Sequence, residues 1–240
     1  MDIFIDKIIK WFVSVYENFY NSVIFENRYE MILSGLENTI ILSFGALILG
    51  IVIGFLISII RYTNKQTGKL KIINSICKIY VSIIRGTPSV LQLMIMYYII
   101  FKTSDINSII IGMLAFGINS GAYCSEILRS GFESVDDGQL EAGLALGLTF
   151  NQTLRTIIIP QAVRIALPSL GNEFITLVKE TSVGAYIGIV ELTKASDIIA
   201  SRTYDYFFPL ILIAVIYFAI TFSLSKLISI MEKRLNYVRN

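Results

Sequence analysis

The chain has 240 residues, of which 55% are hydrophobic and only 16% are charged, and its formal net charge is +2. Because a soluble domain carries about 25% charged residues, these values favour an integral membrane protein. The lack of a basic run excludes a nucleic-acid-binding surface. The chain contains no histidine, so no histidine-based metal site or catalytic triad is expected. Its two cysteines, Cys77 and Cys124, lie in apolar segments and are expected to be buried thiols.

Residues 1–34 begin with an amphipathic segment. Its charged residues Asp6, Lys7 and Lys10 interrupt the apolar run and exclude a signal peptide. One helical face carries five apolar residues: Ile5, Ile8, Ile9, Phe12 and Tyr16. This pattern predicts an N-terminal helix that lies in the membrane interface.

Five segments are predicted to cross the membrane, at residues 36–60, 80–101, 106–128, 169–190 and 206–230. Ile40–Ile60 contains no charged residue and is long enough to cross the hydrocarbon core. Two segments are less regular, because 80–101 contains Arg85 and Pro88 and 169–190 contains three charged residues, Glu173, Lys179 and Glu180. The expected fold is all-α, with a transmembrane domain at 35–232 and a tail at 233–240.

Lysine and arginine predict the orientation. They gather after the first span, at Arg61, Lys65, Lys69, Lys71 and Lys78, and again after the third and fifth spans. The alternate loops hold only Lys102 and, between 191 and 205, Lys194 and Arg202. By the positive-inside rule the N-terminus lies outside, whereas the segment 134–160 and the C-terminus lie in the cytoplasm.

The segment 134–160 is too polar to span a membrane and too apolar for a solvated loop. Asp136 is expected to cap a first short helix that ends at Gly147. Thr149 and Gln152 have the spacing of a capping box for a second helix, which Pro160 is expected to end. Helices this short are unstable alone in water, so they need cover from the spans and from another protein. A packed hairpin without a partner is the alternative. A DNA-binding helix-turn-helix is excluded, since the segment holds a single arginine.

A family resemblance rests on this segment. Glu141-Ala142-Gly143, followed by Gly147 and then Ile157–Pro160, is similar to the pattern EAA-x3-G-x9-I-x-LP of ABC importer membrane subunits. Gly143 stands where the pattern has a second alanine, and Ile159 where it has leucine. Four further stretches resemble the permeases for polar amino acids (the His/Glu/Gln/Arg/opine group): Gly35–Ser43, Ile84–Tyr98, Ser120–Gln139 and Leu167–Ser182. The resemblance covers roughly residues 34–232.

The resemblance implies the type I ABC importer permease fold, with five transmembrane helices and a cytoplasmic coupling hairpin. It implies that an ATP-binding subunit docks on the hairpin through Glu141, Ala142, Gly143, Leu144 and Gly147. It also implies a bacterial inner membrane location, a second permease subunit in a homodimer or heterodimer, and an extracytoplasmic solute-binding protein.

The chain has no phosphate-binding loop of the form G-x4-G-K-[ST]. The chain itself is therefore not expected to be an enzyme, and ATP and Mg²⁺ are expected on a partner subunit. Five spans are also few for a complete substrate path, which favours two copies of the bundle.

Polar residues inside the spans are the candidates for substrate contact. Asn119, Tyr123 and Glu126 share one helical face, and Glu173 lies in the fourth span. Together they offer acceptors for an ammonium group and donors for a carboxylate, as a polar amino acid requires. Two pairings are the structural alternatives: Glu126 with Arg129, and Lys179 or Glu180 with Arg85.

The motif Arg85-Gly86-Thr87-Pro88 predicts a kink or a helix start, because Pro88 removes a backbone donor and Thr87 can satisfy a freed carbonyl. It is a candidate hinge, although Arg85 could simply extend to the membrane interface. The sequence as a whole predicts the permease of an ATP-driven importer of a polar amino acid. An ion-coupled secondary carrier and a non-transporting membrane scaffold are the alternatives.

Overall fold

The computed structural model describes residues 2–237, and all regular structure in that range is helical. The all-α class is therefore confirmed. The α-helices are α1 (Asp2–Phe19), α2 (Arg28–Thr67), α3 (Lys71–Arg85), α4 (Ser89–Ile95), α5 (Ser108–Glu133), α6 (Asp137–Ala145), α7 (Phe150–Thr153), α8 (Ile159–Glu180), α9 (Leu192–Thr203) and α10 (Phe207–Tyr237). Short π-helical or 3₁₀ segments join several of them: Tyr20–Ile24, Phe25–Asn27, Met96–Ile100, Leu154–Ile158 and Thr181–Ile187.

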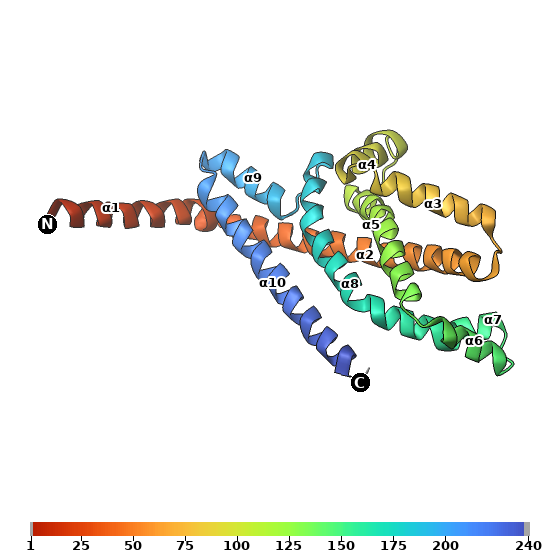
Figure 1. Cartoon of the computed structure of the whole chain (residues 1–240). Coiled ribbons are helices and arrows are strands. Elements are labelled where there is room, and N and C mark those ends of the chain that lie inside the picture. The colour runs from red at the N-terminus through yellow and green to blue at the C-terminus, as the bar shows by residue number, and fades with distance from the viewer. Residues whose placement is uncertain (1, 238–240) are drawn as a thin grey trace.

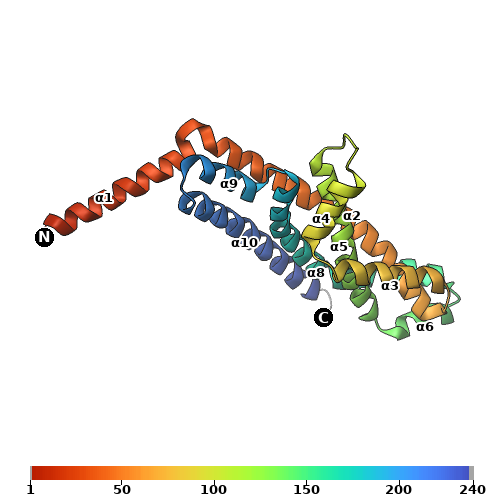
Figure 2. The ribbon, with the colours of Figure 1, turned by 90° about the horizontal axis from the view of Figure 1, so that it is seen from above.

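The long helix α2 is the axis of the molecule, with α5 and α8 packed against it (Figure 1). The short helices α6 and α7 lie at one end, and α1 projects from the other end away from the bundle, as Figure 2 also shows. From Phe4 to Phe19 the apolar side chains of α1 are exposed apart from the half-buried Val15, with Phe4 and Tyr16 at 70% and 67%. On its polar side Lys10 pairs with Asp6 at 3.0 Å.

Small residues allow α2 and α5 to approach closely. Every fourth residue of α2 along this contact is small and buried, namely Ala46, Gly50, Gly54 and Ser58. A Cβ atom on Gly54 would lie 2.6 Å from Cβ of Cys124 on α5. Such contacts are the usual basis of helix association in membranes, where water does not drive apolar burial. Cys77 and Cys124 are both buried free thiols, as expected.

The end of the bundle far from α6 is organised around Glu191, which is 0% exposed. Its carboxylate caps α9 by accepting hydrogen bonds from the backbone N–H groups of Thr193 and Lys194, both at 2.7 Å. Tyr217 of α10 donates a third hydrogen bond at 3.1 Å. The sequence pattern assigned residues 191–205 to a loop, and the helix α9 corrects that assignment.

The predicted spans differ from the helices at two places. Residues 80–101 are not one straight helix, because α3 and α4 meet at 106° across Gly86–Pro88. Residues 169–190 contain the second half of α8 and the 3₁₀ segment Thr181–Ile187.

Pro160 does not end its helix, contrary to expectation. The chain stays helical from Phe150 to Glu180, and Pro160 lies in the first turn of α8. The π-helical turn Leu154–Ile158 comes directly before it. A wide turn of this kind shifts the backbone hydrogen bonds, so the missing N–H of proline is tolerated there.

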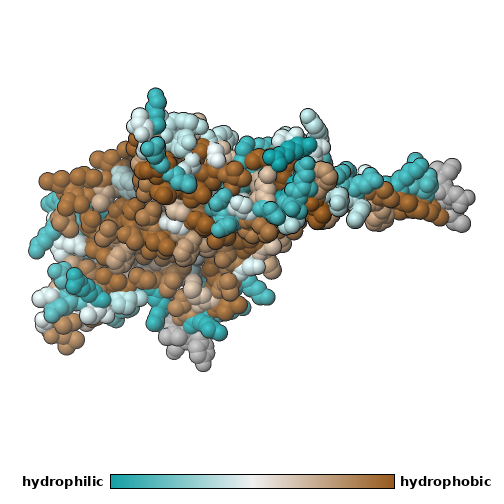
Figure 3. Space-filling view, turned by 180° about the vertical axis from the view of Figure 1, so that it is seen from behind, coloured by the Kyte–Doolittle hydropathy of each residue, from teal (hydrophilic) through white to brown (hydrophobic). Residues whose placement is uncertain are grey.

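The surface is strongly apolar. A broad hydrophobic area covers the body of the molecule, and hydrophilic residues gather at its edges (Figure 3). By length and composition three described segments could cross a membrane, Phe4–Thr67, Ser108–Glu133 and Phe207–Leu235, and the bent pair α3–α4 is a fourth if it forms one span. The number of five spans therefore stays a prediction.

Candidate functional site

The hairpin α6–α7 forms through the local signals that the sequence predicted. Asp136 caps α6 by accepting a hydrogen bond from the N–H of Gly138 at 2.7 Å. Gly147, at φ +84°, ends the turn after α6. Thr149 and Gln152 form the predicted capping box, with Gln152 Oε1 2.8 Å from the N–H of Thr149. These contacts fix the shape of the hairpin before it meets any partner.

One face of the hairpin is buried and the other is open. Leu140 is 8% exposed, whereas Leu144 and Leu146 are 46% and 81% exposed. Of the five residues expected to contact an ATPase, Glu141, Ala142, Leu144 and Gly147 are exposed and Gly143 is buried. A Cβ atom on Gly143 would lie 2.4 Å from Cγ2 of Thr153 on α7, which explains physically why glycine replaces the second alanine of the pattern.

The buried face ties the hairpin to three long helices. Leu140 and Leu154 share a core with Tyr62 of α2, Phe132 of α5 and Ala162 of α8. The rings of Tyr62 and Phe132 stack with their centroids 5.1 Å apart. Because interiors of this kind are close-packed, a displacement of the hairpin is transmitted to α2, α5 and α8.

The predicted substrate residues do not form one cluster. Asn119 is 4% exposed and donates from Nδ2 to Gln92 Oε1 at 2.9 Å. Gln92 in turn donates to the carbonyl of Ile84 at 2.8 Å and to Thr87 Oγ1 at 2.7 Å, so it joins α3, α4 and α5 at the bend. The sequence analysis missed Gln92. Its signal is the single amide in the apolar run Val90–Ile95, one turn after Pro88.

Glu173 of α8 contacts α5 at Ser120, the residue after Asn119. Ser120 donates to Glu173 Oε1 at 2.8 Å, and this is the one hydrogen bond that the carboxylate accepts within residues 2–237. No ion pair engages Glu173 in that range. A carboxylate has about four acceptor positions, so most of its capacity is unused.

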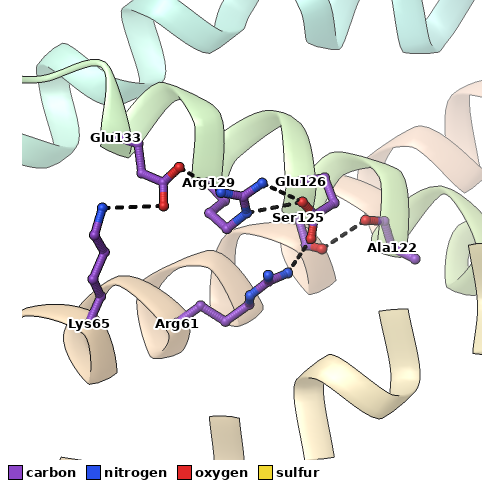
Figure 4. A network of polar contacts seen from close by, with 7 residues as sticks. All are labelled: Arg61, Lys65, Ala122, Ser125, Glu126, Arg129 and Glu133. Atoms are coloured by element: carbon purple, nitrogen blue, oxygen red, sulfur yellow. Dashed lines mark hydrogen bonds and ion pairs between the residues drawn. The ribbon is translucent and has the colours of Figure 1, made fainter. Parts of the chain in front are cut away.

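Glu126 belongs instead to an ion network between α2 and α5 (Figure 4). Its carboxylate accepts from Arg129 at 2.7 Å and from Arg61 of α2. Arg129 also pairs with Glu133 at 2.6 Å, and Lys65 reaches Glu133 at 3.4 Å. The pair Glu126–Arg129 is the structural alternative that the sequence left open.

The motif Arg85-Gly86-Thr87-Pro88 forms the bend between α3 and α4. Thr87 Oγ1 donates to the carbonyl of Ile83 at 2.9 Å, which satisfies a backbone group at the break as predicted. The guanidinium of Arg85 lies over the ring of Tyr123, 5.3 Å from its centroid. Within the described residues Arg85 forms no ion pair with Glu180 and no hydrogen bond with Lys179, and no cluster of three metal-ligating side chains is found.

Known proteins share this architecture. Residues 50–237 match the family described as binding-protein-dependent transport system inner membrane component. The probable amino-acid ABC transporter permease protein YckA of Bacillus subtilis is 37% identical over 223 residues, covering 91% of this chain and 95% of the relative. The putative glutamine transport system permease protein GlnP of Rickettsia felis is 36% identical, with coverages of 90% and 95%.

Solved structures of ABC transporters share the fold of this chain. A chain of an amino acid ABC transporter crystallised with histidines is 41% identical and superposes with a TM-score of 0.77, covering 86% of this chain and 94% of its own. A chain of the MetNI methionine ABC transporter, in an inward-facing form, is 19% identical with a TM-score of 0.70 over 86% and 98% of the two chains, and it supports the fold alone. The chain therefore belongs to the family of binding-protein-dependent transport system inner membrane components, and it is a membrane-spanning permease subunit of an ABC importer.

Proposed function

We propose that this permease imports a polar amino acid. The observation that carries the proposal is the 41% identity and the TM-score of 0.77 with a chain of an amino acid ABC transporter. A solute-binding protein delivers the amino acid at the α9 end, which is the outer side by the positive-inside rule. The amphipathic helix α1 then lies at the interface on the outer side of the inner membrane, and the C-terminus is cytoplasmic.

An ATP-binding subunit docks on the open face of the hairpin. Leu144 and Leu146 are exposed there beside Glu141, so an apolar cleft of the partner can cover them. ATP and Mg²⁺ are held by that subunit. Its closure on ATP moves α6 and, through the core around Phe132 and Leu154, moves α5 and α8. Two such permease subunits, identical or different, enclose the path.

Within the path Glu173 is the strongest candidate for substrate contact. It offers unused acceptor positions to an ammonium group, and Asn119 and Tyr123 lie on the neighbouring α5. Glu126 was placed in the same set, but its carboxylate is engaged by two arginines in this conformation. The substrate would be a basic or neutral polar amino acid, because Glu173 favours positive charge.

The test is to copurify the permease with its ATP-binding subunit and measure ATP hydrolysis in nanodiscs. We expect hydrolysis to increase when the solute-binding protein carries its amino acid. A permease that binds no ATP-binding subunit, and that moves amino acid down an ion gradient alone, would overturn the proposal in favour of an ion-coupled carrier.

A further inference from the structure

A cationic cavity opens near the hairpin, between α2, α3 and α5. Its volume is about 320 Å³. The lining includes the four cations Arg61, Lys65, Lys78 and Arg129, the carboxylate of Glu133 and the amide of Asn74. None of these residues belongs to the expected substrate set or to the expected ATPase contact.

The charges around this cavity do not balance. Two carboxylates, Glu126 and Glu133, pair with Arg61, Lys65 and Arg129. Lys78 is exposed and makes no ion pair within residues 2–237. Asp137 contacts Gln66 at 3.4 Å, and neither of these residues lines the cavity. Four cations and two carboxylates leave the cavity with excess positive charge, which favours an anionic ligand.

The amide of Asn74 is fixed in the wall of the cavity. Asn74 is 7% exposed, and its Nδ2 donates to Asn64 Oδ1 at 2.8 Å. Asn64 donates from its own Nδ2 to the carbonyl of Lys69 at 2.6 Å, which fixes the orientation of both amides. Asn74 Oδ1 is buried and accepts no hydrogen bond from the described chain. Because this oxygen has no accessible surface, the contacts to a ligand come from the cations of the cavity rather than from the Asn74 amide.

The outer face of α3 indicates where the ligand comes from. Four isoleucines form one exposed stripe along this helix, at Ile72, Ile76, Ile79 and Ile83, and each is at least 58% exposed. Lys78 lies between this stripe and the buried Asn74 on the same helix. An acyl chain can follow the stripe while its headgroup enters the cavity. The positive-inside rule places this end in the cytoplasmic leaflet, where anionic lipids attract basic side chains.

We propose that the cavity binds the phosphate headgroup of an anionic phospholipid, for which phosphatidylglycerol is the probe. Its phosphate contacts Lys78 and Lys65, which both line the cavity. The bound lipid would hold α3 against the ion network of α2 and α5. This inference goes beyond the proposed function and does not depend on which amino acid is imported.

The test is a lipid titration of the purified full-length permease, read by native mass spectrometry. Phosphatidylglycerol should bind more tightly than phosphatidylcholine. The variant Lys78→Gln should lower the phosphatidylglycerol affinity about fivefold, the effect of one basic residue at a membrane surface. Lys71→Gln is the matched control, because Lys71 is exposed on the same helix but does not line the cavity, and it should change the affinity less than about twofold.

Equal affinities of Lys78→Gln and the unchanged protein would overturn the proposal, as would equal binding of the two lipids. A separate measurement uses the soluble headgroup sn-glycerol 1-phosphate in place of the lipid. Binding of this compound as tight as that of phosphatidylglycerol would show that the acyl chains contribute nothing, and it would overturn the lipid source. Lys78→Gln breaks no ion pair within the described residues, and unchanged labelling of the buried Cys77 and Cys124 by a thiol-reactive dye confirms that the variant is folded.

Discussion

Two carboxylates in this permease occupy contrasting regions. Glu191, at the start of α9, accepts two backbone N–H groups and the Tyr217 hydroxyl and is fully buried. Glu173, where α8 crosses α5, accepts a single hydrogen bond from Ser120 within the described chain. A carboxylate whose acceptor positions are filled by its own chain supports the fold. One whose positions are mostly free can serve a ligand, since an unpaired charge in a membrane protein is costly.

The hairpin shows the same contrast with apolar groups. Leu140 is covered by the long helices, and no Cβ fits at Gly143 beside Thr153. Leu146, six residues along the chain from Leu140, is 81% exposed. The covered positions hold the hairpin to the bundle, and the uncovered ones are left for a partner.

The largest expected effect on stability comes from Glu191, the carboxylate whose acceptor positions are occupied by its own chain. Glu191→Ala should destabilise the permease by about 3 kcal/mol or more, because each buried donor left without a partner costs about 1–3 kcal/mol. The measurement is thermal unfolding followed with a thiol-reactive dye, since Cys77 and Cys124 are buried. The variant Glu191→Gln keeps an acceptor oxygen, so it should lower the stability of the permease much less. An unchanged unfolding temperature for Glu191→Ala would show that Glu191 does not stabilise the fold.

Glu173, whose acceptor positions are mostly unused, should affect substrate uptake rather than stability. Glu173→Gln should leave the unfolding temperature unchanged and raise the half-saturating substrate concentration of uptake about tenfold or more. A hydrogen bond to a charged group contributes about 1.5–3 kcal/mol, which corresponds to this range. Uptake of arginine or lysine at an unchanged half-saturating concentration would contradict both the contact and the preference for a basic substrate.

Gly143 tests the covered side of the hairpin. Gly143→Ala should push α6 away from α7, at a cost of about 1–3 kcal/mol, as overpacking of a core usually does. ATP hydrolysis per amino acid imported should rise, because the hairpin would transmit movement less well. Adding Thr153→Ala removes the atoms nearest to the new methyl group and should restore part of the coupling. Full coupling in Gly143→Ala alone would mean that the two helices need not touch.

Leu146 tests the uncovered side and has the smallest expected effect. Leu146→Ala should weaken docking of the ATP-binding subunit by about 1–2 kcal/mol, or about tenfold, from the apolar area that is no longer buried. The unfolding temperature of the isolated permease should not change. Leu140→Ala is the matched control and should lower the unfolding temperature instead. Equal docking of both variants and the unchanged protein would place the partner elsewhere.

Local signals in the sequence predicted much of the fold. The uncharged run 40–60 located α2, and the caps at Asp136 and Thr149 located α6 and α7, because each signal acts within one helix. The helix α9 was missed, since it depends on distant contacts: the N–H of Leu192 bonds to Thr39, 153 residues away. Pro160 was misjudged because the π-helical turn before it has no simple sequence signature.

The candidate site divides in the same way. The pair Glu126–Arg129 was foreseeable from a separation of three residues on one helix. Arg61, 65 residues from Glu126, could not be assigned to it without the packing of α2 on α5. Gln92 was missed because its role arises only where the bend brings α4 against Asn119.

We propose that this chain carries an amino acid across the membrane in response to ATP bound by another subunit. The most direct measurement is uptake of labelled amino acid into proteoliposomes that contain the permease, its ATP-binding subunit and the solute-binding protein. We expect uptake that requires ATP, stops with vanadate and persists when an ionophore collapses the ion gradients. Uptake that needs no ATP-binding subunit and stops with the ionophore would contradict ATP-driven transport.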